Sequence, residues 1–139
     1  MDPNFASAHG QLATTYQEMG KYDLWLQEWR KAATLYNDRE TMAIADKVVE
    51  AYAHSGLRAA MYKDIELRKE LSQRRYVDPC FLAFDYAILG EKDQVFYWLE
   101  KAYADKSSLL LPIKVSHVLD PFHSDTRYID LLKRMGLPQ

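Results

Sequence analysis

Two histidines and two aspartates lie close together near the end of the 139-residue chain. His117 and His123 flank Asp120 and Asp125, and imidazole and carboxylate groups of this kind bind divalent metal ions. The spacing, however, matches no pair of ligands one helical turn apart, and no cysteine joins the group. We therefore expect neither a metal site nor a bound cofactor in this chain.

Cys80 is the only cysteine, so the chain has no internal disulfide, which fits a reducing, cytoplasmic compartment. Near a helix start a thiol can have a lowered pKa and act as a nucleophile. No histidine or other base lies at a suggestive spacing, so we expect a buried structural thiol. The sequence also contains no glycine-rich phosphate loop, nucleophile elbow or paired acidic motif. We expect no catalytic residues and hence no enzyme.

Arg74, Arg75 and Tyr76 form a basic and aromatic cluster that could contact nucleic acid. Acidic residues flank it, and it lies near an expected helix end, where cations favour the helix dipole. The formal net charge of −2 gives no general attraction to nucleic acid or anionic lipid. The longest apolar run, residues 109–113, is too short to cross a bilayer. Nucleic-acid binding therefore remains a less favoured alternative.

A tyrosine followed four residues later by glycine occurs three times, at Tyr16–Gly20, Tyr52–Gly56 and Tyr86–Gly90. The tyrosines are 36 and 34 residues apart. A period in this range is typical of stacked supersecondary units. The glycine fits a left-handed helix cap one turn after a large apolar residue, so each unit is expected to be helix, glycine turn, helix.

The first unit carries the most extended motif. Its residues at matching positions are His9, Leu12, Ala13, Tyr16, Gly20, Tyr22, Trp25, Trp29 and Ala32. This run resembles the tetratricopeptide repeat. His9 and Ala13 replace the usual tryptophan and glycine of the first helix, and Trp25 replaces a usually small residue. Arg68 of the second unit stands where an alanine is expected. The resemblance implies three repeats at about 6–39, 42–75 and 76–109, and a C-terminal cap at about 110–136.

The implied fold is all-α, a right-handed superhelical stack of antiparallel helix pairs forming one domain over residues 1–139. Apolar periodicity, Asp-Pro starts and glycine stops predict the individual helices. The predicted helices are Pro3–Met19, Tyr22–Tyr36, Arg39–His54, Leu57–Arg74, a helix starting at Pro79, Glu91–Asp105 and Asp125–Met135. Ser107 and Ser108 are expected to cap a short helix or turn before the last of these, and Ser124 or Asp125 is expected to cap the last helix itself.

Several C-terminal runs extend the resemblance, among them Arg74-Arg75-Tyr76-Val77, Trp98-Leu99-Glu100-Lys101-Ala102-Tyr103 and Leu132-Lys133-Arg134-Met135-Gly136. They are similar to the C-terminal repeat region of bacterial multidomain regulators, which carry a winged-helix, serine/threonine kinase or cyclase domain upstream. The resemblance implies that the chain is a fragment of a longer protein. The activities of such upstream domains do not carry over to it.

The resemblance also implies a concave protein-binding face lined by the first helix of each repeat. The core stripe would be Leu12–Tyr16, Val48–Tyr52 and Leu82–Tyr86. The groove beside it would comprise Thr14, Gln17, Glu18, Lys47, Glu50, His54, Phe81, Phe84 and Ile88. We expect a protein or peptide partner there. Two structural alternatives stay open: residues 109–115 fill the groove, or exposed repeat ends form a homodimer.

Overall fold

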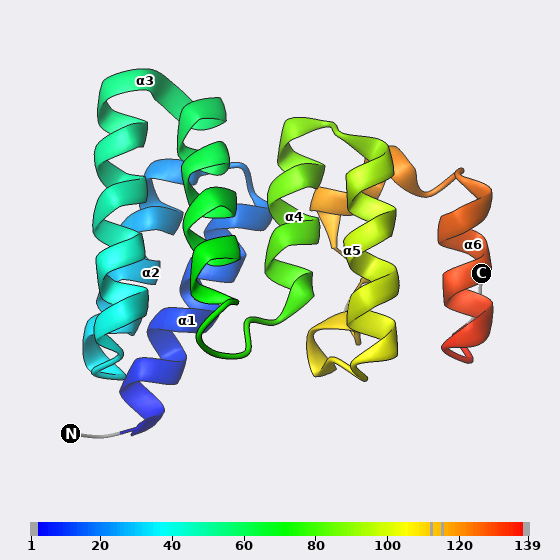
Figure 1. The fold of residues 1–139 in the computed structure, drawn as a ribbon, viewed down its shortest axis with the longest axis horizontal. Coiled ribbons are helices and arrows are strands. Elements are labelled where there is room, and N and C mark those ends of the chain that lie inside the picture. Colours follow the sequence, from blue (N-terminus) through cyan, green and yellow to red (C-terminus); the bar gives the residue numbers. More distant parts are fainter. Residues whose placement is uncertain (1–2, 112, 115, 138–139) are drawn as a thin grey trace. The chain divides into compact units, whose positions relative to one another are not determined.

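The computed structural model describes residues 3–111, 113–114 and 116–137, with side chains described from Ala8 onward. Within these residues no strand occurs. The expected all-α class is therefore confirmed. The α-helices are α1 (Pro3–Glu18), α2 (Tyr22–Leu35), α3 (Arg39–Leu71), α4 (Pro79–Leu89), α5 (Lys92–Ala104) and α6 (Thr126–Arg134) (Figure 1). Two 3-10 helices, η1 (Ser108–Leu110) and η2 (His117–Phe122), lie between α5 and α6.

The chain divides into two compact units, residues 1–76 and 77–139. The first contains α1, α2 and α3, and the second contains the remaining helices. The boundary falls within one residue of the expected junction between the second and third repeats. The expectation that the whole chain forms a single domain stays a prediction.

Aspartate side chains start three of the helices. The Asp38 carboxylate accepts a hydrogen bond from the backbone N–H of Thr41 at 3.2 Å and caps α3. Asp78 accepts from Cys80 at 2.9 Å and caps α4, and Asp125 accepts from Arg127 at 2.8 Å and caps α6. An aspartate at this position supplies an acceptor for one of the unpaired N–H groups of the first turn. The predicted starts at Asp78-Pro79 and Asp125 are confirmed.

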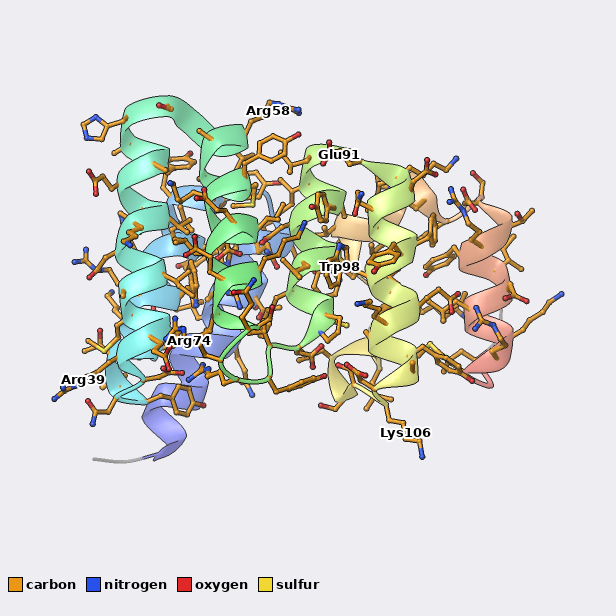
Figure 2. The ribbon with its side chains drawn as sticks, viewed as in Figure 1. Arg39, Arg58, Arg74, Glu91, Trp98 and Lys106 are labelled. Carbon is orange, nitrogen blue, oxygen red and sulfur yellow. The ribbon has the colours of Figure 1, made fainter. Side chains whose placement is uncertain are left out.

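Helix α3 folds back on itself at Gly56 (Figure 1). Gly56 has φ 86° and ψ −172°, a combination that only glycine adopts readily. The bend falls between the two predicted helices Arg39–His54 and Leu57–Arg74. As a result, Arg39 and Arg74 lie at one end of the folded helix and Arg58 at the other (Figure 2). The expected left-handed cap is found at Gly90, whereas Gly56 turns the chain by a different backbone conformation.

In the first unit, α2 packs against both α1 and α3. Small residues make much of this core, which includes Ala13, Leu26, Ala32, Ala33, Ile44, Ala45, Val48, Ala60, Met61 and Ile65. Trp25, at the position expected to be small, stacks on Trp29 with ring centroids 6.4 Å apart. The Arg68 guanidinium lies 5.3 Å from the centre of the Trp29 ring. Arg68 also donates a hydrogen bond to the buried carboxylate of Asp64 at 2.8 Å.

An arginine can thus replace the expected alanine because its charge is paired with Asp64 and its planar face covers an indole.

Leu12 is more exposed than the sequence predicts. It belongs to the predicted core stripe, yet 38% of it is exposed. Tyr16 and Tyr52 are half-buried, and Val48, Leu82 and Tyr86 are buried as expected.

In the second unit, α4 packs against α5, and both η1 and α6 also contact α5. η2 packs on α4 and buries Leu119 and Phe122. These two residues are three apart, and a 3-10 helix places residues three apart on one face. The expected turn near Ser107 is confirmed, because its hydroxyl accepts a hydrogen bond from Leu109 and caps η1. η2 was not predicted.

Replacing Gly56 with alanine should lower the free energy of unfolding by about 1–3 kcal/mol, since the new residue must adopt an unfavourable backbone conformation. Nothing lies within 4 Å of a Cβ built at Gly56, so the cost would come from the backbone alone. Gly10, inside α1, has equally open surroundings and is the control. Gly10→Ala should instead raise stability by about 0.5–1 kcal/mol, as expected for a helix interior. Urea unfolding followed by circular dichroism measures the stability of both variants. Equal effects of the two substitutions would contradict the positive-φ conformation of Gly56.

Candidate functional site

The nine predicted groove residues lie on three helical segments, and none of them belongs to the core. Each set is spaced so that its members share one helix face. Thr14, Gln17 and Glu18 are on α1; Lys47, Glu50 and His54 are on the first half of α3; Phe81, Phe84 and Ile88 are on α4. The first six belong to the first unit and the last three to the second. The nine residues therefore form three separate patches, one on each helical segment.

The patch on α4 is apolar. Phe81, Phe84 and Ile88 recur at intervals of three and four residues, and Phe81 is 41% exposed. Phe84 and Ile88 are half-buried. The rest of α4 is largely buried, including Cys80, Leu82, Ala83 and Tyr86. We call Phe81, Phe84 and Ile88 the α4 strip. An exposed phenylalanine continued by two partly exposed apolar residues can take an apolar side chain of a partner.

The two patches of the first unit are polar. Lys47, Glu50 and His54 are all exposed on α3. On α1 the Thr14 hydroxyl donates a hydrogen bond to the Gly10 carbonyl at 3.2 Å, so its donor is used within the helix. Polar and charged side chains of this kind are stable in contact with water. Their composition alone favours no particular partner.

The basic cluster at the end of α3 is engaged by acids of the same unit. Arg74 binds the Glu40 carboxylate, and Arg75 donates to Asp38 at 2.9 Å. The hydrogen bond from Arg75 lowers the pKa of the Asp38 carboxyl from 3.8 to about 2, against the opposing effect of burial, with further help from Thr41. Both arginines thus hold the end of α3 to its beginning. Their charges are neutralised locally, which leaves little electrostatic attraction for a phosphate backbone.

Cys80 lies in the interior of the second unit and is fully buried. Its Sγ is 3.9 Å from the Ser107 hydroxyl, which itself donates to Asp78 at 2.6 Å. Burial raises the pKa of the Cys80 thiol to about 12. A protonated, enclosed thiol is a poor nucleophile and a poor metal ligand. The geometry gives Cys80 a packing role.

The histidines of the C-terminal segment gather around a single carboxylate. His117 Nδ1 lies 3.1 Å from one Asp120 oxygen, and His123 Nε2 lies 3.7 Å from the other. Residues three apart align on the 3-10 helix η2, which explains the grouping. Asp125, the fourth candidate ligand, instead binds Lys92 and Arg127 at 3.0 and 3.1 Å. Across the described residues, no group of three or more His, Cys, Asp and Glu side chains could hold a metal ion.

Two ion pairs that the sequence analysis missed join α6 to α5. Arg127 binds Asp93 at 3.0 Å, and Arg134 binds Glu100 with two nitrogens. Arg127 also lies 4.5 Å from the centre of the Phe96 ring. Each arginine follows its acid by 34 residues. That offset equals the spacing of Tyr52 and Tyr86, so the repeat period could have revealed both pairs.

An open pocket of about 490 Å³ runs along α5 from Asp93 to Ala104 and is bounded by Arg127 of α6. Its acids, Asp93 and Glu100, are paired with Arg127 and Arg134. The Lys101 ammonium lies 5.2 Å and 5.1 Å from the centres of the Tyr97 and Trp98 rings. The charges of this pocket are thus largely balanced by one another, and their main effect is to hold α6 against α5.

Comparison with protein-family models, curated proteins and solved structures found no match to this chain. Among the helices that the structure describes, none combines the length and apolar character needed to cross a membrane.

Stability should fall as the pH drops from about 4 to about 2, because the pKa of Asp38 is lowered in the folded state. Its contribution is complete above the unfolded pKa of 3.8 and is lost as the carboxylate is protonated towards the folded pKa of about 2. Asp38→Asn keeps an N-cap acceptor but removes the ion pair, and should cost about 1 kcal/mol at pH 7 after solvent screening. The difference between variant and wild type in thermal unfolding should shrink at pH 2. A difference independent of pH would contradict the ion pair.

Cys80 of the folded protein should react with iodoacetamide at pH 8 only as fast as the second unit opens. Burial and a thiol pKa of about 12 leave almost no accessible thiolate. Mass spectrometry of timed samples measures the alkylated fraction. The same chain in concentrated urea is the control and should be alkylated completely. Equal rates in both conditions would mean that Cys80 is open to solvent.

Proposed function

We propose that this chain is a non-catalytic, protein-binding helical scaffold of the tetratricopeptide type, and that the α4 strip accepts apolar side chains of a peptide or partner domain. The observation that carries the proposal is the 41% exposure of Phe81 on a helix whose other faces are largely buried. Water-exposed phenylalanines on a folded surface favour association, because contact with a partner removes apolar area from water.

The repeated architecture supports the same proposal. Helices joined by positive-φ glycines recur along the chain at Gly20, Gly56 and Gly90, at the spacing of the tetratricopeptide repeat. Proteins built from such repeats commonly present extended surfaces to partner proteins. By this proposal the chain acts in the cytoplasm as the C-terminal part of a larger bacterial signalling or transcription regulator.

A second candidate is a purely structural role in which the chain covers its own groove. One observation favours it: η2 packs on α4, and Leu110 and Ile113 of the C-terminal segment are buried. Pro112 and Val115 of that segment lie outside the described residues. Leu111, in contrast, is 71% exposed, so the segment does not turn all of its apolar residues inward. Under this alternative the α4 strip would bind nothing from solution.

Peptides selected from a phage-displayed random library against the full chain test the proposal. Isothermal titration calorimetry measures their affinity for the wild type and for Phe81→Ser. The variant should bind them at least about tenfold more weakly than the wild type, as for truncation of an aromatic anchor. Tyr97→Ser is the matched control, because Tyr97 is an exposed aromatic residue on α5 of the same unit. It should bind the peptides like the wild type.

The proposal fails if the selected peptides bind Phe81→Ser and the wild type equally well, or if no peptide is selected. The second result would support the self-covered alternative. Unchanged circular dichroism of both variants establishes that a loss of binding does not come from unfolding.

A further inference from the structure

The exposed face of α1 carries an uncharged, partly apolar stripe. Ala8, Leu12, Thr15 and Met19 are all exposed, with 38% of Leu12 and 57% of Met19 open to solvent. Their spacing of four, three and four residues puts them on one side of a helix. Met19 directly follows α1, and its N–H donates to the Thr15 carbonyl at 3.1 Å, which continues the helical hydrogen bonding. We call these four residues the α1 stripe.

The polar group within the stripe already has a partner inside the helix. The Thr15 hydroxyl donates to the Gln11 carbonyl at 3.0 Å, so covering Thr15 leaves no unpaired donor. The neighbouring Thr14 is bonded in the same way to Gly10. Covering this face would therefore cost little hydrogen bonding.

The exposed face of α6, in contrast, is charged, and its exposed residues include Arg127, Asp130, Lys133 and Arg134. A solvated helix face normally carries such charges. The sequence of α1 contains one charged residue, Glu18, and it lies outside the stripe. An exposed leucine and methionine on an uncharged face are typical of a surface that is covered by another protein segment.

We propose that the α1 stripe binds the α1 stripe of a second copy of this chain in antiparallel orientation. The spacing is symmetric about its midpoint, so an antiparallel copy places Ala8 opposite Met19 and Leu12 opposite Thr15. A small side chain then faces a large one at both ends, and the contact is self-complementary, as a two-fold dimer requires.

Charge complementarity favours the same occupant. In this register Glu18 lies beside Gln11 of the other copy, so the two glutamates do not face each other. A strongly acidic or basic helix would find no opposite charge on the α1 stripe, whereas a second copy brings a face of equal neutrality. The contact uses one helix per chain and is smaller than a standard stable interface, so the dimer should be weak and reversible.

The experiment is sedimentation equilibrium of the full chain from low micromolar to near-millimolar concentration. The wild type should change from monomer to dimer over this range. Leu12→Glu should weaken dimerisation about tenfold or more, because it places a charge in the contact without a partner. Leu24→Glu is the matched control, since Leu24 is 39% exposed but lies on α2, and it should dimerise like the wild type.

A mixture tests the antiparallel register. Thr15→Lys alone should also dimerise poorly. Mixing it with Leu12→Glu should restore a dimer, because the new carboxylate then lies opposite the new ammonium. The proposal is wrong if the wild type stays monomeric at every concentration, if Leu24→Glu dissociates the dimer as strongly as Leu12→Glu, or if the mixture remains monomeric. The α4 strip belongs to the other unit, so each of these results leaves the proposed peptide binding unaffected.

Discussion

The turn at Gly56 is the constraint on which the first unit depends. Its φ of 86° and ψ of −172° reverse the direction of α3 within a single residue. The reversal brings the end of the helix back to its start, where Arg75 binds Asp38 and Arg74 binds Glu40. It also lets the second half of α3 present Arg68 to Trp29 of α2. Without the reversal the two ion pairs could not form, since their partners would lie at opposite ends of a long helix.

Helix positions could be predicted from the sequence because their signals are local. A tyrosine four residues before a glycine and an aspartate before a proline fix helix ends through the backbone conformation and the hydrogen bonds of the first turn. The all-α class and the limits of most helices followed from these signals. η2 has no comparable signal, because its apolar residues Leu119 and Phe122 are three apart and suit several conformations.

The candidate site was less predictable, since burial depends on which neighbours a helix finds. Leu12 has the spacing of a core residue but remains 38% exposed. Arg68 has the wrong chemistry for its expected alanine position, and only the fold shows that Asp64 and Trp29 receive its charge and its planar face. The spacing of Phe81, Phe84 and Ile88 places the α4 strip on one face of a single helix. Its extent of exposure became known only with the neighbouring segments in place.

The ion pairs between α5 and α6 have a consequence for direction. Asp93 and Glu100 follow each other along α5 in the same order as Arg127 and Arg134 along α6, so the two helices run parallel. Parallel helices place like ends of their peptide dipoles side by side, which opposes close packing. The arginine and carboxylate pairs counter this repulsion, and they are partly screened by dissolved ions. The packing of α6 on α5 is therefore sensitive to ionic strength. The packing of α4 on α5, in contrast, depends mainly on buried apolar side chains.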